Sequence, residues 1–206
     1  VADMVFSVLA ELSISVSFSH SRPHRQPAGP TFPANLPTPP AMRVALLVCP
    51  KVQLLDVVGP TDVFAEAARQ LGNRFAYRLQ VISTGDKRVR SSSGLSLVAD
   101  STIATHRGAI DTLLVAGSPD VDGITGDERA NAWLRRQAGQ VRRLGSVCSG
   151  AFVLGAAGLL DGKRVATHWN FAARLSAQYP RACVDADAIY VCDGKLYTSA
   201  GVPAGM

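Results

Sequence analysis

The stretch Gly145-Ser146-Val147-Cys148-Ser149-Gly150-Ala151 decides the fold that the sequence predicts. It joins a short apolar strand, expected over Leu144–Val147, to an apolar helix, expected over Ala151–Leu160. A strand that turns sharply into a helix lifts the residue at the turn above the edge of the sheet, and the following backbone N–H groups point at whatever approaches it. This geometry presents a nucleophile beside amides that bind an anion. Ser146 departs from the usual elbow pattern, which has a glycine two residues before the nucleophile.

Cys148 stands at this turn and is the candidate nucleophile. A helix N-terminus lowers the pKa of a thiol, so the sequence predicts a reactive thiolate. The alternative is a cysteine packed as a small apolar side chain, as most free cysteines are. The strand, the small residues and the helix around Cys148 favour the first interpretation.

The chain from Met42 onward alternates strands with helices, which indicates an α/β domain with a mostly parallel sheet. Strands are expected at Val44–Cys49, Tyr77–Ser83, Thr112–Ala116, Leu144–Val147 and Lys163–Thr167. Helices are expected from Gly59-Pro60 to Leu71, from Asp127 onward, and over His168–Tyr179. Two hairpins are expected, over Val89–Val98 around Ser93-Gly94 and over Ala188–Ser199 around Asp193-Gly194.

Residues 1–41 differ in composition from the rest. Seven of the twelve prolines lie between Pro23 and Pro40, which is typical of an extended, disordered linker. The apolar stretch Met4–Phe18 is too short to span a bilayer and has no basic segment before it, so no membrane association is expected. The sequence therefore predicts a disordered or weakly structured extension over 1–41, which a start at Met42 would leave out, and one domain over 42–206.

Charge and cysteine content narrow the classes of function. The net charge is +5, and much of the excess lies around the helix that begins at Asp127, in Arg129, Arg135, Arg136, Arg142 and Arg143. A nucleic-acid face is one interpretation, but no aromatic residues interleave with the arginines, so a solvated helix face is favoured. The four cysteines form no C-x-x-C pair, which argues against a zinc site or a disulfide framework and fits a reducing cytoplasm. No cofactor or metal motif is visible, since both G-x-G-x-x-G and the P-loop pattern are absent.

The domain resembles the ThiJ/PfpI superfamily. The resemblance runs from Met42 to Met206 and is carried by Val44–Val48, Leu54–Pro60, Ser92–Leu95, Gly145–Ala151 and Ala166–Trp169. It implies a three-layer sandwich with a flavodoxin-like, class I glutamine amidotransferase-like fold. Two branches are similar: the sensor domain of AraC-family transcriptional regulators, and isocyanide hydratase. The tail, from Tyr179-Pro180 through Tyr197–Val202, resembles the regulator branch more closely.

The resemblance also implies a continuation that this chain lacks. Regulators of this branch go on with a helix that closes the domain and then with two helix-turn-helix units. The expectation is therefore a domain truncated at its C-terminal end, with the closing helix missing, which would contact DNA only through a part absent from these 206 residues. A homodimer is expected as well.

The resemblance places Asp56 beside Cys148, where a carboxyl group handles a proton or hydrogen-bonds the sulfur. The alternative for Asp56 is a cap of the helix at Gly59-Pro60. His168 is a candidate pocket residue, with a structural histidine beside Trp169 as the alternative. The family's protease-like members carry a histidine directly after the cysteine, where this sequence has a serine. Backbone amides and hydroxyls near the cysteine would hold a ligand or an oxyanion, and the candidates are Gly117, Ser118, Ser149 and Gly150.

Three functions follow from this candidate site. The first is a sensor that binds a small-molecule ligand over Cys148. The second is a cysteine-dependent enzyme, of the isocyanide hydratase or amidase type, with Asp56 handling the proton. The third is a redox-sensing thiol. The sensor is the function that the sequence favours.

Overall fold

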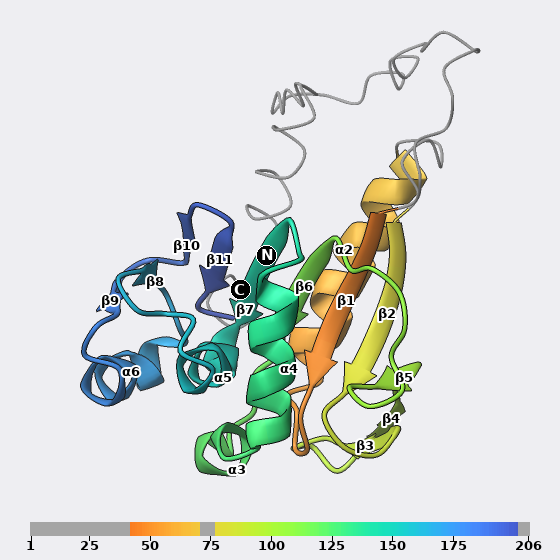
Figure 1. The fold of residues 1–206 in the computed structure, drawn as a ribbon, viewed down its shortest axis with the longest axis horizontal. Coiled ribbons are helices and arrows are strands. Elements are labelled where there is room, and N and C mark those ends of the chain that lie inside the picture. The colour runs from red at the N-terminus through yellow and green to blue at the C-terminus, as the bar shows by residue number, and fades with distance from the viewer. Residues whose placement is uncertain (1–41, 71–76, 202–206) are drawn as a thin grey trace, which may run out of the picture.

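The computed structural model describes residues 42–70 and 77–201, so the predictions made for residues 1–41 lie outside it. Seven strands form the central sheet, in the order β10-β11-β7-β6-β1-β2-β5 (Figure 1). Their bounds are β1 (Met42–Val48), β2 (Tyr77–Ser83), β5 (Ser101–Thr102), β6 (Thr112–Val115), β7 (Arg143–Val147), β10 (Tyr190–Asp193) and β11 (Leu196–Ser199). Every neighbouring pair is parallel except β10 and β11. The mostly parallel sheet is confirmed.

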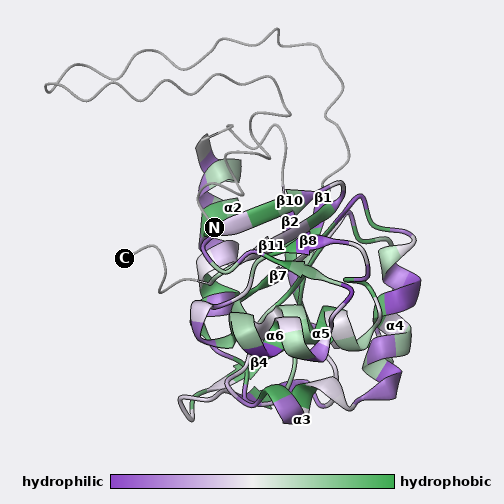
Figure 2. Ribbon diagram, turned by 90° about the vertical axis from the view of Figure 1, so that its left-hand side faces the viewer, coloured by the Kyte–Doolittle hydropathy of each residue, from purple (hydrophilic) through white to green (hydrophobic). Residues whose placement is uncertain are grey.

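Helices cover both faces of the sheet, as the continuous apolar runs of the central strands require. On one face α2 (Leu55–Gln70) packs Phe64 against Val44, Leu46 and Val48 of β1. The other face is covered by α3 (Val121–Thr125), α4 (Glu128–Ala138), α5 (Ala151–Ala156) and α6 (Ala172–Gln178). Figures 1 and 2 show α2 on the opposite side of the sheet from α4 and α5. The result is the expected three-layer α/β sandwich with a flavodoxin-like arrangement.

The α4 helix follows the sequence pattern closely. Asp127 caps it by accepting hydrogen bonds from the N–H groups of Arg129 and Ala130, and Leu134 is fully buried. The outward face of α4 is hydrophilic (Figure 2). Arg143 differs from the expected solvated face, because it lies in β7 with 5% of its surface exposed and its guanidinium 4.0 Å from Asp111.

The first long helix begins earlier than expected. It starts at Leu55 rather than at Gly59-Pro60, so Pro60 lies inside it. The turn already forms at Leu54, whose carbonyl accepts hydrogen bonds from Val57 and Val58. The hydroxyl of Thr61 donates to the carbonyls of Val57 and Val58 beside the proline. This start places Asp56 in the first turn of the helix.

Two small sheets flank the main one. The hairpin β3 (Arg88–Arg90) and β4 (Ser96–Val98) is antiparallel, as expected, and so is the β10–β11 hairpin. The strand expected over Lys163–Thr167 is wrong in extent: β8 (Arg164–Val165) has two residues and pairs with β9 (Cys183–Val184) outside the main sheet. Directly after β8, Ala166 donates its N–H to the hydroxyl of Thr198 in β11 at 2.8 Å.

Two helical segments are also shorter than expected. The run after Cys148 forms a 3-10 turn, η1 (Cys148–Gly150), and then α5, which ends at Ala156 rather than at Leu160. The helix expected over His168–Tyr179 divides into a 3-10 turn, η2 (Trp169–Phe171), and α6. Across the described ranges 42–70 and 77–201, no helix has both the length and the apolar character needed to cross a membrane.

Candidate functional site

The backbone at Cys148 has the geometry of a nucleophile elbow. Val147 is extended, whereas Cys148 has a φ of 56°, which a residue with a side chain rarely adopts. Gly150 makes the turn possible, because a Cβ at this position would lie 2.2 Å from the carbonyl oxygen of Val115 in β6. The strand, turn and helix predicted around the cysteine are therefore confirmed.

Asp56 lies beside the Cys148 thiol, although it belongs to α2. Its side chain is fully buried, and burial raises the pKa of its carboxyl group to about 6. One oxygen, Oδ2, accepts a hydrogen bond from the Gly117 N–H at 3.1 Å, while the buried Oδ1 has no partner among the described residues. Asp56 is therefore inside the helix and turned toward the cysteine, so the alternative of a helix cap is wrong.

The protonation of Cys148 differs from the sequence prediction. Burial and, after it, the negative charge of Asp56 raise the pKa of the thiol to about 12. The Ser149 N–H acts in the opposite direction with a smaller effect. The expectation of a lowered pKa is wrong because the thiol is partly removed from water and lies beside a carboxylate. At neutral pH the site holds a protonated thiol against an ionised carboxylate.

Two of the amides expected to receive a ligand, those of Gly117 and Ser118, donate hydrogen bonds within the protein. The Gly117 N–H donates to Asp56, and the Ser118 N–H donates to the Ser149 hydroxyl at 2.9 Å. The Ser149 hydroxyl in turn donates to the Ser118 carbonyl at 2.6 Å. A Cβ on Gly117 would lie 2.7 Å from Asp56 Oδ2 and 2.8 Å from Ser149 N, so only glycine fits there. These bonds fix the loop after β6 against the elbow.

The His168 side chain makes its contacts within and beside η2. Its Nδ1 caps η2 by accepting a hydrogen bond from the Asn170 N–H at 3.3 Å, and its ring packs near Trp169 and Phe171. The preceding residue, Thr167, makes the direct link to the elbow: its hydroxyl donates to the Cys148 carbonyl at 2.9 Å. The contacts of His168 are those of the structural alternative.

Gly201 is a site residue that the sequence reasoning missed. It follows β11 with a φ of 99°, and a Cβ there would lie 2.9 Å from Cys148 Cβ and 3.3 Å from Cys148 Sγ. A larger residue would cover the thiol. The available signal was the Ser199-Ala200-Gly201 run at the end of a strand parallel to the one that carries the cysteine.

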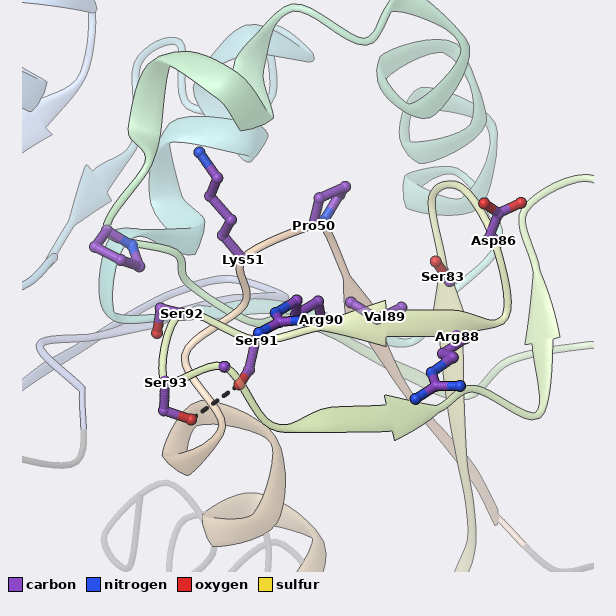
Figure 3. Close-up of a pocket in the computed structure, with 12 residues that line it drawn as sticks. Pro50, Lys51, Ser83, Asp86, Arg88, Val89, Arg90, Ser91, Ser92 and Ser93 are labelled. Atoms are coloured by element: carbon purple, nitrogen blue, oxygen red, sulfur yellow. Dashed lines mark hydrogen bonds between the residues drawn. The ribbon is translucent and has the colours of Figure 1, made fainter.

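A cavity of about 780 Å³ lies beside this elbow, between the loop after β1, the β3–β4 hairpin and the loop after β6 (Figure 3). Its lining includes Lys51, Arg88, Arg90 and Pro119. Cys148 and Asp56 are not among the residues that line it.

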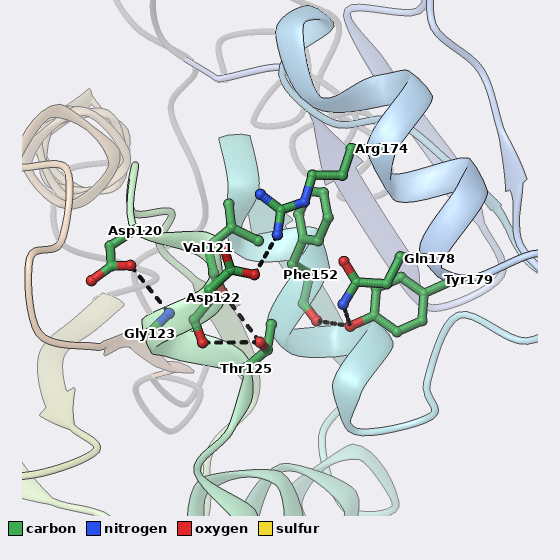
Figure 4. Close-up of polar contacts among 9 residues, drawn as sticks. All are labelled: Asp120, Val121, Asp122, Gly123, Thr125, Phe152, Arg174, Gln178 and Tyr179. Carbon is green, nitrogen blue, oxygen red and sulfur yellow. Dashed lines mark hydrogen bonds and ion pairs between the residues drawn. The ribbon is translucent and has the colours of Figure 1, made fainter.

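The helix after the elbow is anchored through Phe152, which is fully buried in α5. The Arg174 guanidinium lies 5.7 Å from the centroid of its ring and forms an ion pair with Asp122, and the Tyr179 hydroxyl donates to the Phe152 carbonyl at 3.1 Å (Figure 4). These contacts join α5, the helix that follows the elbow, to α6 and its C-terminal end.

The arrangement provides one exchangeable proton between a thiol and a carboxylate in a buried site. No group of three or more His, Cys, Asp or Glu residues suitable for a metal ion occurs within the described part of the chain. All four cysteines are free. The thiol and the carboxylate can hydrogen-bond a ligand, or the sulfur can attack while Asp56 takes the proton.

The sequence of this chain is similar to those of several known proteins. The chain is 34% identical over 166 residues to the isonitrile hydratase of Pseudomonas putida. The match covers 81% of this chain and 68% of that enzyme. It is 33% identical over 139 residues to the HTH-type transcriptional regulator GbdR of Pseudomonas aeruginosa, where the match covers 68% of this chain and 37% of the regulator.

A solved structure of an AraC family transcriptional regulator from Pseudomonas putida superimposes with a TM-score of 0.67 at 26% identity, over 80% of this chain and 85% of that one. The family model described as DJ-1/PfpI family matches residues 42–206. With the parallel sheet, the cysteine elbow and the buried aspartate in place, this match shows that the chain belongs to the DJ-1/PfpI family.

Proposed function

We propose that residues 42–206 form the ligand-sensing domain of an AraC-family transcriptional regulator. In this proposal a small molecule binds over Cys148, the domain works as a homodimer in the cytoplasm, and DNA is contacted only by a helix-turn-helix part outside these 206 residues. The similarity to GbdR and to the solved AraC-family structure supports the assignment.

The observation that carries the proposal is the setting of the cysteine: Cys148 is partly buried beside the fully buried Asp56. A thiol whose pKa is raised to about 12 is a weak nucleophile at neutral pH, because only the thiolate attacks. His168, the candidate pocket residue, caps η2. A partly buried thiol and a buried carboxylate that hydrogen-bond a ligand fit a binding site better than a hydrolytic one.

A second candidate is a hydratase that acts on isonitriles, and Asp56 is the observation that favours it. Its pKa near 6 and its unpartnered, buried Oδ1 equip it to accept the thiol proton while sulfur bonds to the terminal isonitrile carbon. That carbon then receives the proton, which gives a thioimidate. Addition of water and departure of the Cys148 sulfur, which takes its proton back, yield the N-substituted formamide.

The experiment that separates the two functions is a turnover assay. The intact chain is incubated with a simple alkyl isonitrile, and the loss of the isonitrile stretch is followed by infrared spectroscopy. The proposal predicts no turnover above that of the Cys148→Ala variant, in protein that melts cooperatively. Turnover that Cys148→Ala abolishes, Asp56→Asn slows strongly and the exposed-thiol control Cys192→Ala leaves unchanged would establish the hydratase.

The regulator role has a separate test in the gene. The reading frame beyond the codon for Met206 should encode a pair of helix-turn-helix units in frame. A stop codon directly after this position in the genomic DNA would contradict the regulator assignment.

A further inference from the structure

The cavity beside the elbow lies where open α/β sheets bind ligands. Strand β1 stands between β2 and β6, so the chain adds strands first on one side of β1 and later on the other. Ligands of such sheets bind outside the carboxyl ends of the strands, at the point where the strand order reverses. Pro50 and Lys51 follow β1 and Pro119 follows β6, and all three line the cavity. The third wall is the β3–β4 hairpin (Figure 3).

Two arginines line the cavity from one face of β3. Arg88 and Arg90 are exposed, whereas Val89 between them is buried, because successive side chains of a strand point to opposite faces. No ion pair joins either guanidinium to a carboxylate among the described residues. Two arginines on one face of a short strand therefore present two forks of N–H donors to the same space.

The remaining charges of the lining leave this space positive. Lys51 extends away from the arginines toward α3 (Figure 3), and its Nζ lies 2.8 Å from Asp120 Oδ2. Asp86 is the one carboxylate that lines the cavity. The lining therefore holds two guanidinium groups and one carboxylate besides the paired Lys51, and an anionic ligand would balance the charge.

Hydroxyl groups complete the set of donors. Ser91, Ser92 and Ser93 all line the cavity at the tip of the hairpin. The hydroxyls of Ser91 and Ser93 lie 2.9 Å apart, and since one proton serves that bond, the other is available to a ligand. Guanidinium forks with neighbouring hydroxyls are the usual partners of carboxylate and phosphate oxygens.

We propose that Arg88 and Arg90, with the serines of the hairpin tip, bind the oxyanion of a small organic molecule, carboxylate or phosphate, in the cavity at the carboxyl ends of β1 and β6. This site is distinct from Cys148. The two share a wall, because the Ser118 hydroxyl donates to the Lys51 carbonyl at 2.8 Å while the Ser118 N–H donates to Ser149.

The test is isothermal titration calorimetry on the 206-residue chain with three probes: inorganic phosphate, succinate and the neutral succinamide. We expect at least one anion to bind and succinamide not to bind. Replacing both arginines (Arg88→Gln with Arg90→Gln) should weaken binding at least about tenfold, and higher ionic strength should weaken it further. Binding of phosphate alone assigns a phosphate ligand, and binding of succinate alone assigns a carboxylate.

Two control variants make the result specific. Arg78→Gln removes the same charge from an exposed residue at the opposite end of β2 and should leave the dissociation constant within about twofold. Arg129→Gln, an exposed arginine of α4 that does not line this cavity, should also leave the dissociation constant within about twofold. The proposal is overturned if the folded chain binds neither anion, if succinamide binds as tightly as succinate, or if Arg78→Gln weakens binding as much as the double variant.

Discussion

Replacing Asp56 by asparagine should change the pH dependence of stability in a direction unusual for an aspartate. Burial raises the pKa of Asp56 from an ordinary value of 3.8 to about 6. Between these values the folded protein binds the proton more tightly than the unfolded chain, so stability falls as the pH rises from 3.8 to 6. Above pH 6 the full cost of ionising the buried group is present. A shift of roughly two pH units corresponds to about 3 kcal/mol.

The variant removes this cost, because its amide has no charge at any pH. Urea unfolding of the wild type and of Asp56→Asn, followed by circular dichroism at pH 4 and at pH 7.5, gives two differences in unfolding free energy. The unpartnered amide group lowers the stability of the variant equally at both pH values. The difference, variant minus wild type, should therefore be about 2 to 3 kcal/mol more positive at pH 7.5 than at pH 4.

Asp111 supplies a control of opposite sign. Burial works against its ionisation, but hydrogen bonds from Arg142 and Thr112 outweigh burial and lower its pKa. Asp111→Asn should therefore lose more stability at pH 7.5 than at pH 4. The reasoning about Asp56 is refuted if the unfolding free energy of Asp56→Asn minus that of the wild type is the same at both pH values. It is also refuted if this difference becomes more negative from pH 4 to pH 7.5, as expected for Asp111→Asn.

Other consequences follow from the same contacts. Brief, limiting iodoacetamide at pH 8 should label the exposed Cys183 and Cys192 before Cys148, whose pKa is raised, and mass spectrometry that finds Cys148 labelled first would contradict this order. Gly150→Ala should lower the free energy of unfolding by about 3 kcal/mol, because its Cβ would collide with the β6 backbone. Gly126→Ala has open space around the added Cβ and should stay within about 0.5 kcal/mol in the same urea titration.

Much of the fold could be predicted from the sequence, because its signals are local. The Tyr77–Ser83 strand, the β10–β11 hairpin around Asp193-Gly194 and the cap at Asp127 all appear where the pattern placed them. In each case the sequence pattern that predicts the element lies in the residues that form it. The start of α2 was missed because Pro60 is typical of a first turn, whereas the helix here begins with Leu55 and accommodates the proline inside.

The site was predicted less completely, because its contacts join distant elements. The sequence identified Cys148, and the family resemblance placed Asp56 beside it, as the structure does. The hydrogen bonds of Gly117 to Asp56 and of Ser118 to Ser149 depend on how the loop after β6 meets the elbow. The spacing of these residues along the chain does not predict that contact. Gly201 was missed for the same reason, since its closeness to Cys148 follows from the parallel pairing of β11 with β7.

The pKa of Cys148 depends on the relative size of two effects, that of the helix N-terminus and that of burial beside Asp56. A helix N-terminus is worth about 0.3 to 2 kcal/mol to a nearby negative charge, or roughly one pH unit in the pKa of a thiol. Burial and the Asp56 carboxylate together move the pKa upward to about 12. Burial first, and the Asp56 charge after it, therefore outweigh the local turn in setting the pKa of the thiol. Any ligand or substitution that neutralises Asp56 should lower the pKa of Cys148, so the same elbow can serve a binding domain or, with a proton on Asp56, a nucleophile.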